Sequence, residues 1–561
     1  MSRAMFLFVR SSMVRRYGMS RPDWQRNPGN VRAMRHVFPR TMKLCLFFTL
    51  LLAGMVVAAD FDLLITNALI ADGSGAPLVK GSIAVKGGKI VAVGQIEGAA
   101  DQIIDAGGNV AAPGFIDVHT HSEDICLNPA AANFLRMGVT TIVTGNCGHS
   151  RTDVAKFFAE IEESKVALNV ATLIGHGSVR DQGMGGSFIR APNAEQLAVM
   201  KGLVDQAMKD GAVGLSTGLI YVPGSFAKTE ELIELAKSAA AHDGIYVSHM
   251  RYETVRIFEA LDEIIRIAKE AKIRAEVSHI KLSGPTAWGK AAEVLAVLDK
   301  ARAEGLQITH DQYAYTASST GLRQTLPDSA LEGEREDFIA RIADPQQKAE
   351  IIAQMAEMRV RQGRKDYSYA VIARCKSDPT LNGKTIPEAA KMKRGADTLE
   401  DQIEFILDLE AQGGASAIFH GMNEDDLQAF LKHPLTMIAS DGGPRRLGED
   451  VPHPRSYGNN ARVLGRYVRE LKLLSLEEAV RRMTSLPAQT FRLKDRGQLK
   501  AGAFADIVIF DPAKVTDPST FNDPHHHAEG FSDVIVNGGV VIRDGKLTEV
   551  RSGGPLRLKE P

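Results

Sequence analysis

The middle of the chain alternates short apolar runs with longer stretches of helical periodicity. The apolar runs have the length and the Val, Ile and Leu content of buried strands. The stretches between them, such as AEQLAVMKGLVDQAMKDG and TEELIELAKSAAAHDG, repeat apolar residues at the spacing of amphipathic helices. Eight strand–helix units in series predict an α/β fold, a (β/α)8 barrel over residues 117–489. The predicted strands are GFIDVHTH, VTTIVTGNCG, ALNVATLIGH, AVGLSTGLIY, GIYVSHM, RAEVSHI, LQITHDQY and PLTMIASDGG.

Both flanks of this region have the alternating pattern of β-strands instead. Residues 60–116 hold FDLLITNALIADG and GSIAVKGGKIVAVG, and residues 490–561 hold ADIVIFDP and SDVIVNGGVVIRDG, all bounded by Gly-rich turns. Because the two ends of a domain often lie close together, we expect one small β-sandwich built from both ends of the chain.

One interval between predicted strands is too long for a single crossover helix. Residues 322–420 separate strands seven and eight and contain charged, helix-prone segments such as PQQKAEIIAQMAEMRVRQ. We expect a helical insertion on the carboxyl face of the barrel, where it could cover a site as a lid.

The amino-terminal region has the pattern of an export signal. Met42 and Lys43 precede the apolar run LCLFFTLLLAGMVV, which ends in small residues before Asp60. This pattern predicts a signal peptide over residues 42–59, no stable membrane anchor, and a periplasmic or secreted protein. Residues 1–41 are Arg-rich with Asp23 as their one acid. We favour the interpretation that they are untranslated and that synthesis starts at Met42, with a transit peptide as the alternative.

Composition and charge narrow the class of partner. The chain is 44% hydrophobic and 24% charged with a formal net charge of −1, so it is an ordinary globular sequence without the basic excess of nucleic-acid or anionic-membrane binders. We therefore expect a small-molecule substrate, while the oligomeric state stays open. Without Cys45 of the predicted signal, three cysteines remain, Cys126, Cys147 and Cys375, which is no disulfide framework.

Residues of metal-ligand type stand at the ends of several predicted strands. Barrel enzymes place catalytic groups at this face, and two histidines two positions apart point to the same side of a strand. One such histidine or cysteine alone is more often a buried structural residue. An ordered set with imidazole, thiolate and carboxylate groups indicates a shared cation, and the mixture suits Zn2+ better than Mg2+ or Ca2+. The set comprises His119, His121, Cys147, His249, His279 and Asp441.

Several motifs carry a family resemblance. PGFIDVHTH resembles the first-strand motif of the metal-dependent amidohydrolase superfamily. TGNCG, GLIYVPG, SHMRYE, SHIK, DQYAYTASST, ASDGGP, HPRSYG and TSLPAQTFRLKDRGQLKAGAFADIVIFDP together resemble the N-acyl-D-amino-acid deacylase (D-aminoacylase) branch, from about residue 61 to about residue 544. Many superfamily members have a carbamylated Lys on strand four, but GLSTGLIY contains no Lys. The branch uses a Cys after strand two, which Cys147 matches.

The resemblance implies a division of the ligands. Cys147, His249 and His279 would hold one tight Zn2+, and His119, His121 and Asp441 would form a second, weaker position. Zinc lowers the pKa of bound water to about 7 and polarises the carbonyl, and Asp441 can take the proton of that water and deliver it to the leaving amine.

The resemblance also implies a substrate-binding set. Arg455 matches the residue that grips the substrate carboxylate, which a guanidinium can do through two hydrogen bonds. Lys281, Tyr221, Tyr313 and Ser319 match other residues of the pocket. His176 and Arg180 at the end of strand three are interpreted as supporting residues, and the run His525–His527 as an exposed surface loop.

These inferences predict a zinc-dependent enzyme that hydrolyses N-acyl-D-amino acids to a carboxylic acid and a free D-amino acid. A dipeptidase acting on dipeptides with a C-terminal D-residue is an alternative, because its substrate also presents an amide beside a carboxylate. A cyclic amide hydrolase is disfavoured by the missing Lys on strand four. A non-catalytic binding barrel is the remote alternative, since it should lack a ligand or the proton-transferring Asp.

Overall fold

A computed structural model describes residues 59–558 of the chain. The predicted leader over residues 1–41 and nearly all of the predicted signal peptide lie outside this range, so both stay predictions. Within residues 59–558, no helix has the length and apolar content needed to cross a membrane.

The centre of the molecule is the predicted barrel of parallel strands. Strand β8 continues past Leu173 into β9, so the two segments together form the third of the eight barrel strands. A parallel bridge between Thr120 and Gly442 joins the first barrel strand to the last and closes the barrel. The remaining neighbours pair in parallel along the chain order. The strands are β6 (Phe115–Asp117), β7 (Val139–Thr144), β8 (Asn169–Thr172), β9 (Ile174–Gly175), β10 (Gly214–Gly218), β11 (Ile245–His249), β12 (Arg274–Val277), β13 (Ile308–Gln312) and β17 (Thr436–Ile438).

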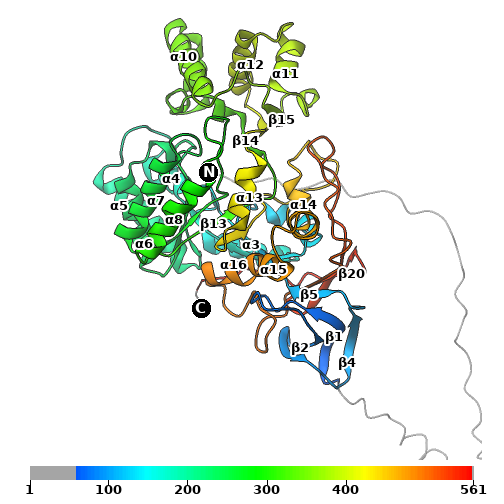
Figure 1. Ribbon diagram of the computed structural model, residues 1–561. Helices are drawn as coiled ribbons and strands as arrows, with labels where there is room; N and C mark the ends of the chain where they lie inside the picture. The colour runs from blue at the N-terminus through cyan, green and yellow to red at the C-terminus, as the bar shows by residue number, and fades with distance from the viewer. Residues whose placement is uncertain (1–58, 559–561) are drawn as a thin grey trace, which may run out of the picture. The chain divides into compact units, whose positions relative to one another are not determined.

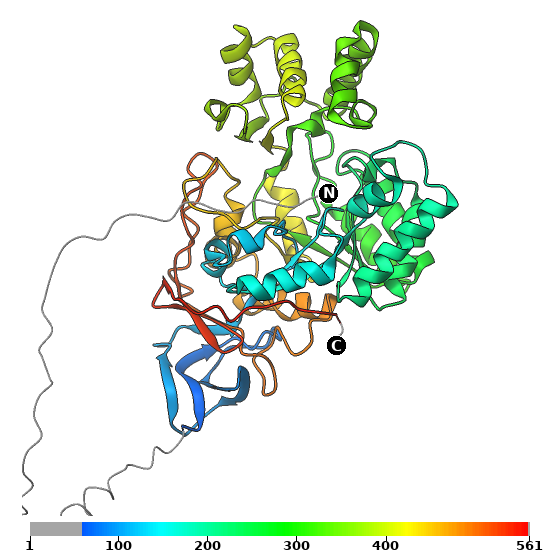
Figure 2. The ribbon, with the colours of Figure 1, turned by 180° about the vertical axis from the view of Figure 1, so that it is seen from behind.

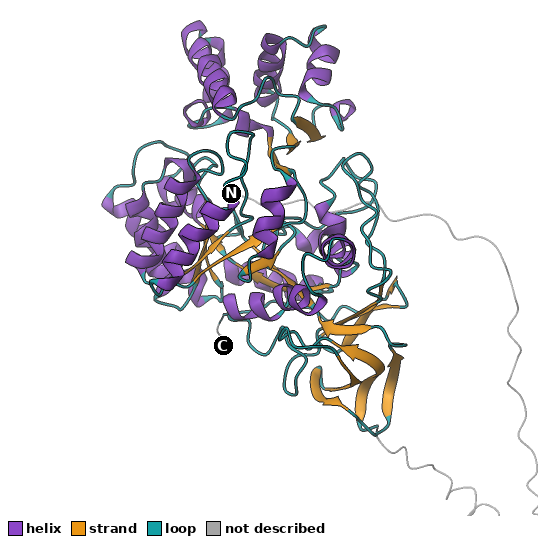
Figure 3. Ribbon diagram, viewed as in Figure 1, coloured by secondary structure: helices purple, strands orange, loops and turns teal. Residues whose placement is uncertain are grey.

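Apolar side chains fill the barrel interior, and helices enclose the strands (Figure 3). Val118, Val143 and Val247 are buried together in the interior cluster, because alternate residues of each strand point inward. Helix α7 presents Leu261 and Ile264 to the strands from its buried face. The surrounding helices are α2 (Ala132–Leu135), α3 (Val154–Ser164), α4 (His176–Met184), α5 (Ala194–Lys209), α6 (Thr229–Ala240), α7 (Ile257–Ala271), α8 (Ala291–Ala303), α13 (Glu424–Lys432), α14 (Arg455–Arg462), α15 (Leu476–Met483) and α16 (Ser485–Thr490).

The two ends of the described chain build one small β-domain, as the alternating patterns predict. Strand β5 pairs antiparallel with β18, which joins the amino-terminal and carboxyl-terminal strands into one continuous hydrogen-bonded sheet. Figure 2 shows the blue and red strands of this domain beside each other. Its strands are β1 (Phe61–Ile70), β2 (Val79–Lys86), β3 (Lys89–Gly94), β4 (Ala100–Asp105), β5 (Val110–Pro113), β18 (Ile507–Phe510), β19 (Phe531–Val536), β20 (Gly539–Arg543) and β21 (Lys546–Leu547).

The insertion between strands seven and eight of the barrel, whose helices lie at the top of Figure 1, has a hydrophobic core of its own. Phe338, Met355, Tyr367 and Phe405 are buried together in it. The sequence pattern predicts helices here, and the structure adds a three-stranded antiparallel sheet whose first strand begins before residue 322. Its elements are α9 (Arg335–Ala343), α10 (Pro345–Arg361), α11 (Ile386–Arg394), α12 (Leu399–Ala411), β14 (Ser318–Gly321), β15 (Ala370–Arg374) and β16 (Ser416–Phe419).

Candidate metal centre and active site

The predicted ligands all lie at the carboxyl ends of barrel strands. His119 and His121 follow β6, and Cys147 follows β7. His249 is the last residue of β11, while His279 and Asp441 stand just beyond β12 and β17. The strand ends therefore bring residues that are more than 300 positions apart in the sequence to one mouth of the barrel.

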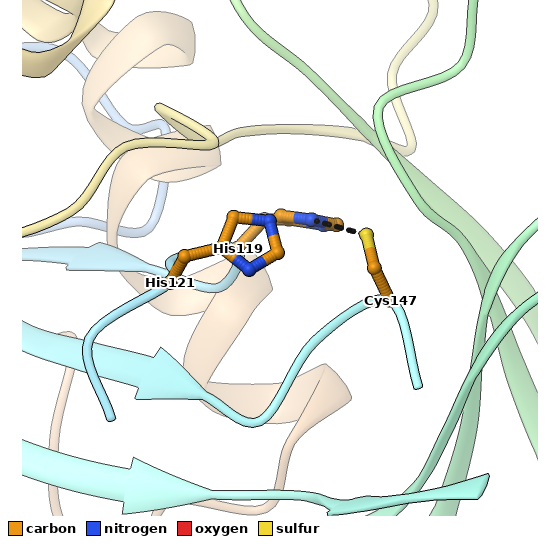
Figure 4. A group of neighbouring side chains, drawn as sticks. All are labelled: His119, His121 and Cys147. Carbon is orange, nitrogen blue, oxygen red and sulfur yellow. Dashed lines mark hydrogen bonds between the residues drawn. The ribbon is translucent and has the colours of Figure 1, made fainter. Parts of the chain in front are cut away.

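Cys147 lies at the centre of this group. Its Sγ is 3.3 Å from His119 Nε2, as drawn in Figure 4, and 3.5 Å from both His249 Nδ1 and His279 Nε2. The thiol and the two imidazoles of the predicted tight site thus face one point, and all three side chains are buried.

The second predicted ligand set lies against the first. Asp441 Oδ1 is 3.1 Å from His121 Nε2 and 3.8 Å from His119 Nε2. Potential ligand atoms of His119, His279 and Asp441 also lie within 4.8 Å of one another. Sulfur, nitrogen and oxygen donors that converge in a buried place fit zinc, so the residues present match the cofactor that the sequence predicts.

The backbone reaches the site through sharp turns. Cys147, His279 and Asp441 have φ values of 52°, 34° and 51°, in the left-handed region that residues other than glycine rarely adopt. Gly218 at the end of β10 gives the Cys147 turn its space, because a Cβ there would lie 2.1 Å from the carbonyl oxygen of Cys147. The backbone at Cys147, His279 and Asp441 is thus strained, and this conformation directs the three side chains to one point.

Burial favours the uncharged forms of the imidazole and thiol ligands. It lowers the pKa of both His249 and His279 well below the ordinary value, which leaves each imidazole neutral. Burial likewise raises the pKa of the Cys147 thiol well above its ordinary value. A bound cation reverses this effect on a thiol, since it stabilises the thiolate directly.

Asp441 is the charged exception. Burial would raise its pKa, but the Arg455 guanidinium and the hydrogen bond with His121 hold the pKa well below its ordinary value. Arg455 Nη1 lies 2.9 Å from Asp441 Oδ2. Burial would lower the pKa of His121, but the hydrogen bond with Asp441 and the charge of Asp441 raise it above its ordinary value.

Two carboxylates that were not predicted from the sequence lie behind the ligands. Asp311 Oδ2 lies 3.4 Å from His119 Nδ1, and Glu253 Oε1 lies 3.4 Å from His249 Nε2 and 3.3 Å from His279 Nδ1. Both belong to motifs that carry the family resemblance, DQYAYTASST and SHMRYE. Asp311 lies near the end of β13 and Glu253 lies shortly after β11, and this position at strand ends could have marked both as site residues.

The predicted substrate-binding residues fall into two groups. Arg455, Tyr221 and Ser319 line a cavity of about 760 Å³ that also exposes His121, Cys147 and Asp441. Residues of the insertion, Gly321, Arg374 and Ser416, border the same cavity, which agrees with the expected lid position.

Lys281 and Tyr313 are not among the residues lining that cavity. Lys281 is buried behind the ligands, with Nζ 2.7 Å from His279 Nδ1. Tyr313 is also fully buried, and the Arg455 guanidinium lies 4.6 Å from the centre of its ring. Their predicted contact with substrate stays a prediction, and in this structure their contacts are with other site residues.

The supporting residues and the histidine run have separate places. His176 and Arg180 share the buried carboxylate of Glu231, at 2.9 and 3.0 Å. Within the histidine run, His526 is exposed and pairs with Asp523, whereas His525 and His527 are half-buried. The prediction of an exposed run is therefore right for one of the three residues. None of them belongs to a potential metal cluster among the described residues.

Comparison with known proteins gives a consistent result. A model of the amidohydrolase family matches residues 102–542. The chain is 36% identical over 521 residues to a D-aminoacylase of Alcaligenes xylosoxydans xylosoxydans, an alignment that covers 88% of this chain and 97% of the relative. It is 34% identical over 505 residues to an N-acyl-D-glutamate deacylase of the same organism, with 86% and 93% covered.

Solved structures agree on the fold. A crystal structure of a D-aminoacylase superposes with a TM-score of 0.75 at 33% identity and covers 89% of this chain and 99% of its own. An N-acyl-D-glutamate deacylase from Bordetella bronchiseptica, complexed with zinc and a phosphonate mimic of the tetrahedral intermediate, gives the same score, identity and coverage.

Proposed function

The chain belongs to the amidohydrolase family, and from this membership and its site we propose that it hydrolyses N-acyl-D-amino acids. The products are a carboxylic acid and a free D-amino acid. The observation that carries the proposal is the convergence of Cys147, His249 and His279 beside the Asp441–Arg455 pair. Cys147, Asp441 and Arg455 also line one cavity. Relatives whose alignments cover 86–89% of this chain are named D-aminoacylase, N-acyl-D-glutamate deacylase and N-acyl-D-aspartate deacylase.

Zinc is the cofactor of the proposed reaction. Cys147, His249 and His279 would hold the tight ion, and His119, His121 and Asp441 would offer the weaker position next to it. A similar D-aminoacylase structure is described as having a binuclear metal centre, activated by one metal and attenuated by the second. When bound, zinc acidifies water and polarises the amide carbonyl.

Asp441 moves the proton. Its low pKa keeps it an anion at neutral pH, so it is ready to accept a proton, and its Oδ1 faces the ligand cluster rather than solvent. A carboxylate in this place can take a proton from the attacking water and return it to the amide nitrogen, whose departure as an amine requires a proton.

Arg455 binds the carboxylate of the substrate. One guanidinium nitrogen contacts Asp441, and Nη2 is 3.4 Å from the carbonyl oxygen of Ser319, so the planar group is already oriented at the cavity wall. The five donors of a guanidinium allow it to hold a second carboxylate beside the first. This places the scissile amide, one carbon away from that carboxylate, next to Asp441.

Tyr221, which also lines the cavity, is a neutral hydrogen-bond donor. Burial raises the pKa of its phenol well above the ordinary value, so the hydroxyl keeps its proton at neutral pH. Its ring packs edge-on against His249, with 4.8 Å between the ring centres, which fixes the phenol beside the ligand cluster.

Substrate discrimination tests the proposal. Purified protein with measured zinc content is assayed on N-acetyl-D-methionine, N-acetyl-L-methionine and L-Ala-D-Ala. We expect fast hydrolysis of the first alone. Equal rates on the two enantiomers would refute D-selectivity, and preferential cleavage of L-Ala-D-Ala would favour the dipeptidase, whose free amino group Asp181 at the cavity wall could bind.

Export is a separate part of the proposal. Cleavage of the signal over residues 42–59 delivers the barrel to the periplasm or the exterior, where free small molecules are its substrates. Mass spectrometry of the native protein checks this, and a mature amino terminus upstream of Asp60 contradicts it.

A further inference from the structure

One carboxylate oxygen stands among three nitrogen atoms behind the predicted tight zinc site. Glu253 Oε1 is 3.4 Å from His249 Nε2, 3.3 Å from His279 Nδ1 and 2.5 Å from Lys281 Nζ. Glu253 lies four residues after His249, in the loop that leaves β11. The backbone carbonyl of Glu253 accepts a hydrogen bond from Ser283, which ties this loop to the one that follows β12.

The orientation of the two imidazoles gives this oxygen a task. His249 turns Nδ1 toward Cys147, and His279 turns Nε2 toward it. A neutral imidazole that gives one lone pair to a metal carries its hydrogen on the other nitrogen. In both residues that other nitrogen lies within 3.4 Å of Glu253 Oε1, so one carboxylate oxygen is close enough to accept a hydrogen from each ring once both rings bind a metal.

Lys281 makes the same carboxylate electrostatically necessary. Its ammonium is buried, 2% exposed, and lies 2.7 Å from His279 Nδ1. An ammonium group has donors only, so it cannot accept the hydrogen of a metal-bound His279. Without a counter-ion, a buried positive charge at this distance repels a cation on the far side of the ring.

We propose that Glu253 is a positioning residue of the zinc site, which fixes the tautomers of His249 and His279 and neutralises the charge of Lys281. The proposal rests on the proposed function, because it presupposes zinc at Cys147. Glu253 does not touch the reacting atoms and acts through the ligands. Carboxylates that hold metal-binding histidines typically contribute 10- to 100-fold to metal affinity, so we expect an effect of about that size.

Zinc affinity of the full mature chain, measured by competition with a chelator, tests the proposal. E253Q keeps an acceptor oxygen but removes the charge, and E253A removes both. We expect zinc affinity to fall about tenfold in E253Q and about 100-fold in E253A. In E253Q/K281M the uncompensated ammonium is gone, so a large part of the loss should be recovered relative to E253Q.

Glu231→Gln is the matched control. Glu231 is also a buried carboxylate shared by an imidazole and a cation, His176 and Arg180, but neither belongs to the ligand cluster. The zinc affinity of the Glu231→Gln variant should stay within about twofold of that of the wild type. A general loss of stability would weaken both variants alike, so the difference between them reports the positioning role.

The outcomes separate this inference from the proposed function. Wild-type zinc affinity in folded E253Q and E253A, or no recovery in E253Q/K281M, overturns the role of Glu253 while the wild-type enzyme still binds zinc and hydrolyses its substrate. Wild-type protein that binds no zinc overturns the proposed function itself. If E253A fails to fold, the comparison of E253Q with E253Q/K281M decides alone.

Discussion

Replacing Asp441 by Asn removes the proposed proton carrier and leaves the tight zinc ligands in place. Asn keeps the size of the side chain and one oxygen, but it cannot accept a proton at neutral pH. Loss of a general acid–base group lowers turnover by about 10²- to 10⁴-fold, which is about 3 to 5 kcal/mol in the barrier.

The same substitution also has a cost in stability. Asp441 and Arg455 are 8% and 3% exposed, and their charged atoms are 2.9 Å apart. Breaking a buried ion pair from one side costs about 3–5 kcal/mol, because the remaining charge is left without a partner. We expect a lower melting temperature, yet one equivalent of zinc should remain on Cys147, His249 and His279.

The assay combines turnover of N-acetyl-D-methionine with zinc content by mass spectrometry on the same sample. Asp426→Asn is the control. Asp426 is also buried and accepts hydrogen bonds from Gly289 and Asn423, but it lies outside the cavity. More than a tenth of wild-type turnover in zinc-loaded D441N would refute the proton-transfer role, and loss of all zinc would refute the division into two metal positions.

Other substitutions test the remaining parts of the site. C147S should lose the tight zinc and activity together, while C375S, also buried but absent from the ligand cluster, should keep both; retained stoichiometric zinc in C147S contradicts the assignment. G218A should lower the unfolding free energy by about 1–3 kcal/mol in denaturant titrations, since its Cβ would overlap the carbonyl of Cys147, and unchanged stability contradicts this packing. R455M should raise KM for N-acetyl-D-methionine by about 10²-fold or more with a smaller change on an analogue whose carboxylate is an amide, and equal effects on both argue against the clamp. Because folding lowers the pKa of Asp441, its contribution to the stability of metal-free protein is complete above the unfolded value near pH 4 and disappears as pH falls through the lower folded pKa; D441N should remove this acid dependence, and identical pH profiles contradict the pKa shift.

The barrel could be predicted because its signal is repeated. All eight predicted strands coincide with strands of the barrel, since each contains an apolar run long enough to be recognised as a strand without its neighbours. The sheet of the insertion could not, because β14 and β16 are short and their pairing joins residues about 100 positions apart. The charged segments around these strands have a helical pattern, so a prediction from neighbouring residues alone favours helices in the insertion.

The ligand residues were visible because imidazole and thiol groups at strand ends are unusual. Asp311 and Glu253 were not, since a carboxylate near a strand end is ordinary until the nitrogen atoms that face it are known. Lys281 shows the limit of spacing: it points to the side of His279 as a strand predicts, yet it is buried against Glu253 rather than in the cavity. The spacing of two residues along a strand predicts which side their side chains point to, whereas how deeply each side chain is buried depends on the neighbouring loops.

The central claim is that a thiolate and imidazoles from separate strands bind one zinc ion. X-ray absorption at the zinc edge of purified, active protein measures this directly. We expect one sulfur at about 2.3 Å from the zinc and nitrogen or oxygen ligands at about 2.0–2.1 Å. A first shell without sulfur, or active protein without stoichiometric metal, would contradict it.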